Sequence, residues 1–153
     1  MSVSNEQLAL LLQASRDFAL EQMASGDRLI PFAGRVKLDG EIEIVRFVDQ
    51  RTELPLDEVF ARTGAVMADE AGRGELLAAS LTAAVILDEP EQGFDAALRV
   101  HVEAPGYSRQ VLVPYAVDPA GPGEDQGSLR LGEMVAYNLE PTIFGSEAKI
   151  SLQ

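Results

Sequence analysis

Apolar residues near the N-terminus recur every three to four positions, at Leu8, Leu11, Leu12, Phe18 and Ala19. This spacing places them on one face of an α-helix. Ser4 or Asn5 can cap its start, and Ser25-Gly26 favours its end because glycine accepts the left-handed cap conformation. The pattern therefore predicts a helix over residues 5–24.

The next pattern is typical of extended chain. Residues 30–38 and 41–48 are separated by Asp39-Gly40. Asp-Gly between extended runs is a strong hairpin signal, because a type I′ turn needs positive φ at both central residues. We therefore predict a hairpin with a two-residue type I′ turn.

Helical spacing returns at Pro55, which suits the first position of a helix. Asp57 and Glu58 complement the positive end of its dipole, and Gly72 and Gly74 stop it. The pattern predicts a second helix between these limits, with an apolar face formed by Leu56, Val59, Phe60, Val66 and Met67.

The remaining chain favours β-structure. The apolar run 76–87 could extend the helix in its first half, and from Thr82 to Leu87 it is typical of a buried strand. Residues 94–104 alternate, and Pro105-Gly106 leads into a further strand. After a polar loop at 118–128, a last strand is expected at about 129–137, with a short piece at 141–144.

This order of elements predicts a single α+β domain covering residues 1–153. A hairpin followed by a meander gives an antiparallel sheet of five to six strands. We expect this sheet to be packed against two helices that cover one of its faces.

Two segments carry a resemblance to a group of proteins. PFAGRVKLDGE at 31–41 follows the predicted N-terminal helix, and DAALRVHVEAPGYSRQVLVPY covers 95–115. The layout resembles small uncharacterised bacterial α+β proteins that have a helix, a Pro-Phe-x-Gly strand and an Asp-Gly hairpin. The resemblance implies a compact bacterial α+β domain and carries no activity with it.

Composition narrows the function classes. The 153 residues contain 25 acidic and 12 basic side chains, a net charge of −13, and no cysteine. The charge disfavours nucleic acids and anionic membranes, and the lack of cysteine excludes disulfides, thiolate metal sites and a cysteine nucleophile. The N-terminus reads as an amphipathic helix and not as a signal peptide. We expect a cytoplasmic protein without a cofactor.

The strand 94–104 holds the candidate catalytic residues. Arg99, His101 and Glu103 share one face, opposite Leu98, Val100 and Val102. A histidine beside a carboxylate can act as a general base. The alternative, which we favour, is a solvated polar face. The acidic stretch of Asp88, Glu89, Glu91 and Asp95 lacks the spacing of a calcium loop, so no metal site is predicted.

The strand after Pro105-Gly106 holds the candidate binding residues Tyr107, Arg109 and Tyr115. They alternate along the strand and bracket an aliphatic stretch, and Tyr and Arg are common at binding surfaces. Tyrosines at the edge of a core give the same pattern, so both interpretations stay open.

These observations favour a non-enzymatic protein-interaction module, of the immunity, chaperone or regulator kind. Its expected partner is a basic protein. The sheet also allows a homodimer, in which two copies pair their sheets or strand edges. The alternative is a small-molecule-binding domain or a simple acid–base enzyme with a pocket at the sheet.

Overall fold

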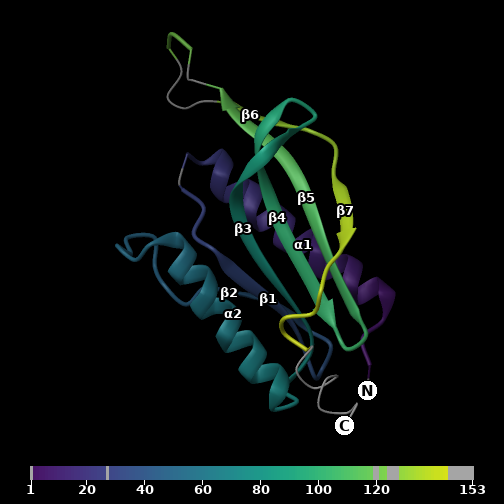
Figure 1. The fold of residues 1–153 in the computed structure, drawn as a ribbon. Coiled ribbons are helices and arrows are strands. Elements are labelled where there is room, and N and C mark those ends of the chain that lie inside the picture. The colour runs from purple at the N-terminus through teal and green to yellow at the C-terminus, as the bar shows by residue number, and fades with distance from the viewer. Residues whose placement is uncertain (1, 27, 119–120, 124–127, 145–153) are drawn as a thin grey trace.

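The computed structural model describes residues 2–26, 28–118, 121–123 and 128–144. Within these residues two helices flank a seven-stranded antiparallel sheet (Figure 1). The elements in chain order are α1 (Asn5–Ala24), β1 (Phe32–Lys37), β2 (Ile42–Val45), α2 (Leu56–Gly72), β3 (Leu76–Glu91), β4 (Phe94–Ala104), β5 (Tyr107–Asp118), β6 (Ser128–Leu131) and β7 (Val135–Asn138).

The sheet confirms the predicted α+β class and the hairpin-plus-meander order. Its strands lie in the order β2-β1-β3-β4-β5-β6, and β7 pairs with β5 as well. The strand count exceeds the predicted five to six because the segment 129–137 forms two strands instead of one. Between them the N–H of Gly132 donates to the carbonyl of Pro114, 2.7 Å away. Each strand therefore pairs with a different part of β5.

The two helices cover opposite faces of the sheet, so the prediction that they share one face is wrong. Ser15 of α1 lies 2.8 Å from Ser80 of β3 between hydroxyl oxygens. On the other face, Arg35 of β1 donates to Glu70 of α2 over 2.7 Å. The reason lies in β3, where residues 76–83 are all buried. A strand that is apolar on both faces needs cover on both.

Close packing joins α1 to the centre of the sheet. A Cβ atom at Gly34 would stand 2.6 Å from the Ser80 hydroxyl oxygen and 2.9 Å from Cδ1 of Leu11. Only a residue without a side chain permits this approach. The Pro-Phe-x-Gly pattern thus has a packing reason, because its glycine lets α1 lie directly on β1 and β3.

The turns differ from prediction. At Asp39-Gly40 only Gly40 has positive φ, at 89°. The N–H of Lys37 donates to the carbonyl of Glu41 and the N–H of Gly40 donates to the carbonyl of Lys37, which closes a three-residue loop. The predicted type I′ turn is therefore wrong there, since a three-residue hairpin needs one left-handed residue only. Two successive positive φ values occur instead at Gln92 (55°) and Gly93 (84°), between β3 and β4.

The ends of the predicted β region also need correction. The run 76–87 is strand throughout, because β3 begins at Leu76 and continues to Glu91. Residues 141–144 form no strand, and Ile143 and Phe144 are buried against the α2 side of the sheet. Most of the predicted loop at 118–128 lies outside the described residues.

Candidate functional site

The candidate catalytic row lies on the α2 side of β4, where the helix and the C-terminal segment leave a cavity. α2 packs on β1 and β3, and residues 139–144 lie on the same face of the sheet, over β4. The cavity between them has a volume of about 440 Å³. Its lining comes from α2, three strands and the C-terminal segment: Phe60, Ala61, Gly64, Ala65, Ala68, Leu81, Arg99, His101, Gln110, Leu139 and Thr142.

Glu103 is fully buried and anchors the C-terminal segment. Its carboxylate accepts hydrogen bonds from the backbone N–H groups of Thr142 (3.0 Å), Ile143 (2.8 Å) and Phe144 (2.6 Å). Burial by itself would raise the pKa of Glu103, but the hydrogen bonds from His101 and these N–H groups outweigh it and hold the pKa below its usual value. Glu103 therefore acts as an ionised structural anchor.

His101 is 4% exposed, so neither it nor Glu103 belongs to a solvated face, and that prediction is wrong for both. Its Nε2 atom lies 3.1 Å from Oε2 of Glu103 and 2.9 Å from the Ser108 hydroxyl oxygen. A Ser-His-acid relay uses both ring nitrogens, one to take the serine proton and the other to bond the acid. Because both contacts fall on Nε2, the geometry does not supply that relay.

Arg99 is a half-buried cation between two cavities. Its guanidinium carbon lies 4.7 Å from the centre of the Phe60 ring. Its Nε atom is buried without a hydrogen-bond partner, and no carboxylate of the described chain lies within 4 Å of it. Burial lowers the pKa of Arg99. The side chain therefore offers N–H donors that the described protein leaves unused.

A second cavity of about 240 Å³ adjoins the first. Phe60 and Arg99 line both cavities. The remaining lining of the second is Leu29, Pro31, Leu56, Asp57, Ala83, Ala84 and Val85. Arg99 thus stands where a mostly apolar hollow meets one that contains His101, Gln110 and Thr142.

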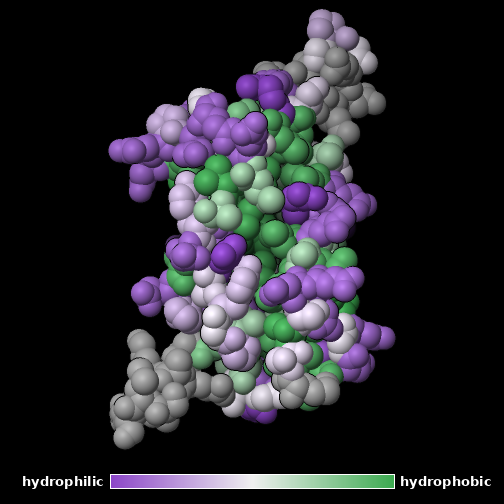
Figure 2. Space-filling model, turned by 90° about the vertical axis from the view of Figure 1, so that its right-hand side faces the viewer, coloured by the Kyte–Doolittle hydropathy of each residue, from purple (hydrophilic) through white to green (hydrophobic). Residues whose placement is uncertain are grey.

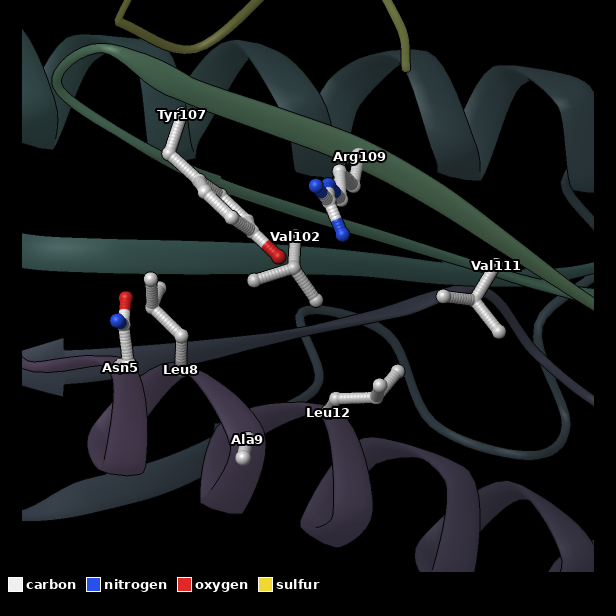
Figure 3. Close-up of a pocket in the computed structure, with 8 residues that line it drawn as sticks. All are labelled: Asn5, Leu8, Ala9, Leu12, Val102, Tyr107, Arg109 and Val111. Atoms are coloured by element: carbon white, nitrogen blue, oxygen red, sulfur yellow. The ribbon is translucent and has the colours of Figure 1, made fainter. Parts of the chain in front are cut away.

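The candidate binding residues lie on the α1 side. Tyr107 and Arg109 border a groove of about 360 Å³ between α1 and β5. The guanidinium carbon of Arg109 lies 5.6 Å from the centre of the Tyr107 ring. Figure 3 shows both side chains directed toward the groove, above Leu8 and Leu12 of α1. In Figure 2, hydrophobic residues form a band down the side of the molecule that carries β7 and the start of α1.

Tyr115 lies apart from this groove. It stands opposite Ala96 of β4 and Leu131 of β6, near the other end of β5. Burial raises the pKa of its hydroxyl. The structure therefore brings together two of the three predicted binding residues and places the third on a different part of the sheet.

An apolar row crosses the sheet at Tyr115; it is exposed at its two ends and half-buried at Ala96 and Tyr115. Ile86, Ala96, Tyr115 and Leu131 are successive partners on four strands and share the α1 face. Ile86 is 87% exposed and Leu131 44%. The acidic stretch around the β3–β4 turn, at Asp88, Glu89, Glu91 and Asp95, forms no ion pair with another described residue. No three described His, Asp or Glu side chains are grouped as metal ligands.

Several residues of the site have no local signal in the sequence. Phe60 fits the apolar face of α2, and Ser108 and Gln110 look like ordinary polar strand residues. Their role follows only from the positions of Arg99 and His101 beside them. Comparison with known proteins finds no matching family model, no similar curated protein and no similar solved structure. Neither described helix is long and apolar enough to cross a membrane.

Proposed function

We propose that this protein binds a small anionic ligand at Arg99, in the cavity between α2 and the sheet. The observation that carries the proposal is the unpaired guanidinium at the junction of two cavities. The chain has 25 acidic residues, yet no described carboxylate lies within 4 Å of Arg99. A bound anion would supply the missing acceptor.

The ring of Phe60 does not replace that acceptor. A cation–π contact contributes about 0.5–2 kcal/mol and engages the face of the guanidinium, whereas its N–H groups point along the edge. A buried donor without an acceptor costs about 1–3 kcal/mol. Phe60 therefore holds Arg99 in place, and the N–H groups of Arg99 remain available to a hydrogen-bond acceptor.

The cavity also suits a ligand in size and chemistry. Its volume of about 440 Å³ is within the usual range for small-molecule sites. His101 and Gln110 add polar groups beside Arg99, and the alanines and Gly64 of α2 form a smooth apolar wall. We propose binding and not acid–base catalysis, because Nε2 of His101 already contacts Glu103 and Ser108.

The test is a titration of the ¹⁵N-labelled protein with acetate, benzoate and inorganic phosphate, with benzamide as the neutral counterpart of benzoate. At least one anion should shift the amide resonances around residues 99–101 and 110. Arg99→Gln should weaken its binding tenfold or more, since a charged hydrogen bond is worth about 1.5–3 kcal/mol. Arg109→Gln, the same change on the α1 side, is the matched control.

If no anion shifts these resonances, or if both variants weaken binding equally, the proposed site is wrong. Circular dichroism of each variant separates loss of binding from loss of fold.

A second function, docking of a basic protein, is favoured by the row of Ile86, Ala96, Tyr115 and Leu131. Ile86 is the most exposed large hydrophobic residue of the described chain, and unpaired acids stand beside it at the β3–β4 turn. Apolar contact framed by charge is the usual composition of a transient interface. A second copy of the chain is disfavoured there because like charges would meet.

This docking surface is tested with a synthetic amphipathic peptide that has leucines on one face and lysines on the other. Ile86→Asp should weaken its binding several-fold, and added salt should slow its association. Leu10→Asp, on the exposed side of α1, is the control. Sedimentation that shows an Ile86-dependent homodimer would overturn the assignment to a basic partner.

A further inference from the structure

On the basis of the proposed ligand site, we infer that the ligand is an apolar monocarboxylate. Its carboxylate pairs with Arg99, and its hydrocarbon part fills the second cavity beside Leu29, Pro31 and Leu56. The inference names the ligand class of the proposed site, and it rests on how the two cavities differ.

The lining of the second cavity is suited to a hydrocarbon group. Four of its lining residues come from the chain before β1 and the start of α2, and three come from β3. Leu29 is buried, and Leu56 and Val85 are half-buried, so their apolar surfaces face one another across the hollow. Apart from Arg99, the only charged residue in the lining is Asp57, which is exposed and lies at the first turn of α2.

Asp57 fixes the direction in which a carboxylate can lie. It is not within ion-pair distance of Arg99 in the described structure. A carboxylate deep in the second cavity would approach this like charge, whereas one at Arg99 meets an unpaired cation. The charged end therefore belongs at the junction and the apolar end in the second cavity.

The first cavity is less suited to the hydrocarbon part. It contains the polar side chains of His101, Gln110 and Thr142, which an apolar group would cut off from water. The second has a volume of about 240 Å³. This equals about eight water molecules at roughly 30 Å³ each, which is room for a chain of several carbons.

The experiment is calorimetric titration of the full chain with straight-chain monocarboxylates from acetate to octanoate, with the matching primary alcohols for comparison. Each methylene should tighten binding about fourfold until the cavity is full, the equivalent of about 0.8 kcal/mol per buried CH₂. The alcohols should bind at least tenfold more weakly than the acids of equal length.

Two variants test which of the two cavities holds the hydrocarbon chain of the ligand. Leu56→Trp enlarges a side chain of the second cavity and should abolish the dependence on chain length. Ala61→Leu enlarges a side chain of the first cavity, one turn further along α2, and should leave the dependence on chain length intact. Val85→Phe repeats the test from the β3 side should Leu56→Trp fail to fold.

The outcomes separate the two proposals. The inference is overturned if binding needs Arg99 but does not tighten with chain length. It is also overturned if Ala61→Leu alters binding and Leu56→Trp does not. Either result leaves the proposed anion site at Arg99 intact. Absence of binding by every carboxylate, with inorganic phosphate also inactive, overturns both. Fourfold steps that vanish in Leu56→Trp and Val85→Phe support both.

Discussion

The Nε2 atom of His101 lies 3.1 Å from Oε2 of Glu103, and both side chains are buried beneath residues 139–144. Glu103 in turn accepts three backbone N–H groups from residues 142–144. A strand in the middle of the sheet is thus tied to the C-terminal segment by one carboxylate. Because Thr142 lines the larger cavity, this tie also fixes one wall of the candidate ligand site.

Glu103→Gln should destabilise the protein by about 3 kcal/mol, because an amide NH₂ replaces one acceptor oxygen and faces N–H donors that are left unsatisfied. Urea unfolding measures the loss, and hydrogen exchange should become faster at Ile143 and Phe144. Glu53→Gln is the control, since Glu53 is exposed and its side chain makes no interaction with described residues. Unchanged exchange at Ile143 and Phe144 would contradict the anchoring role.

The pKa of Glu103 makes this stabilisation depend on pH. Its pKa in the folded state is below the ordinary value, so folding favours the charged carboxylate. The contribution is complete above the unfolded-state pKa of about 4.3 and is lost as the pH falls through the folded-state pKa. The difference in unfolding free energy between wild type and Glu103→Gln should therefore shrink below about pH 4.3. A difference that grows on acidification would show that the carboxylate is not the stabilising form.

Gly34→Ala should cost about 1–3 kcal/mol, the usual penalty for overpacking a core. The new methyl would overlap the Ser80 hydroxyl and Leu11, and α1 would have to move away from the sheet. Gly72→Ala is a matched control at the end of α2, where nothing lies within 4 Å of an added Cβ, and its stability should be equal or slightly higher. Thermal unfolding of the two variants compares them directly, and equal stability would refute the close contact.

Ser15 and Ser80 should behave as a coupled pair. Their hydroxyl oxygens are 2.8 Å apart and both residues are fully buried. Ser15→Ala or Ser80→Ala alone leaves one buried hydroxyl unsatisfied, whereas the double variant removes both. A double-mutant cycle should give a coupling of about 1 kcal/mol, so that the double variant loses less stability than the sum of the single ones. Additive losses would mean that the hydrogen bond contributes nothing.

Two parts of the fold followed from local pattern. The pattern predicts the helix 5–24 at its observed limits, because its apolar residues repeat at the helical period and Ser4 or Asn5 can cap its start. The structure decides between the two caps, since Ser4 and Gln7 form a capping box. The alternation of residues 94–104 likewise predicted that Arg99, His101 and Glu103 share one face of β4, since neighbouring strand residues point to opposite sides. These features depend on residues only a few positions apart, so a sequence contains them directly.

The sequence by itself thus determined the α+β class, most of the elements and the grouping of the row on β4. The tertiary structure decided what covers that row. α2 lies opposite α1, Phe60 stacks on Arg99, and Thr142 reaches Glu103 across 39 positions of chain. Periodicity says which residues share a face and nothing about which distant segment packs on it. The burial of Glu103 and the unpaired state of Arg99 arise from that packing, because both depend on how much water and how many partners the other segments leave.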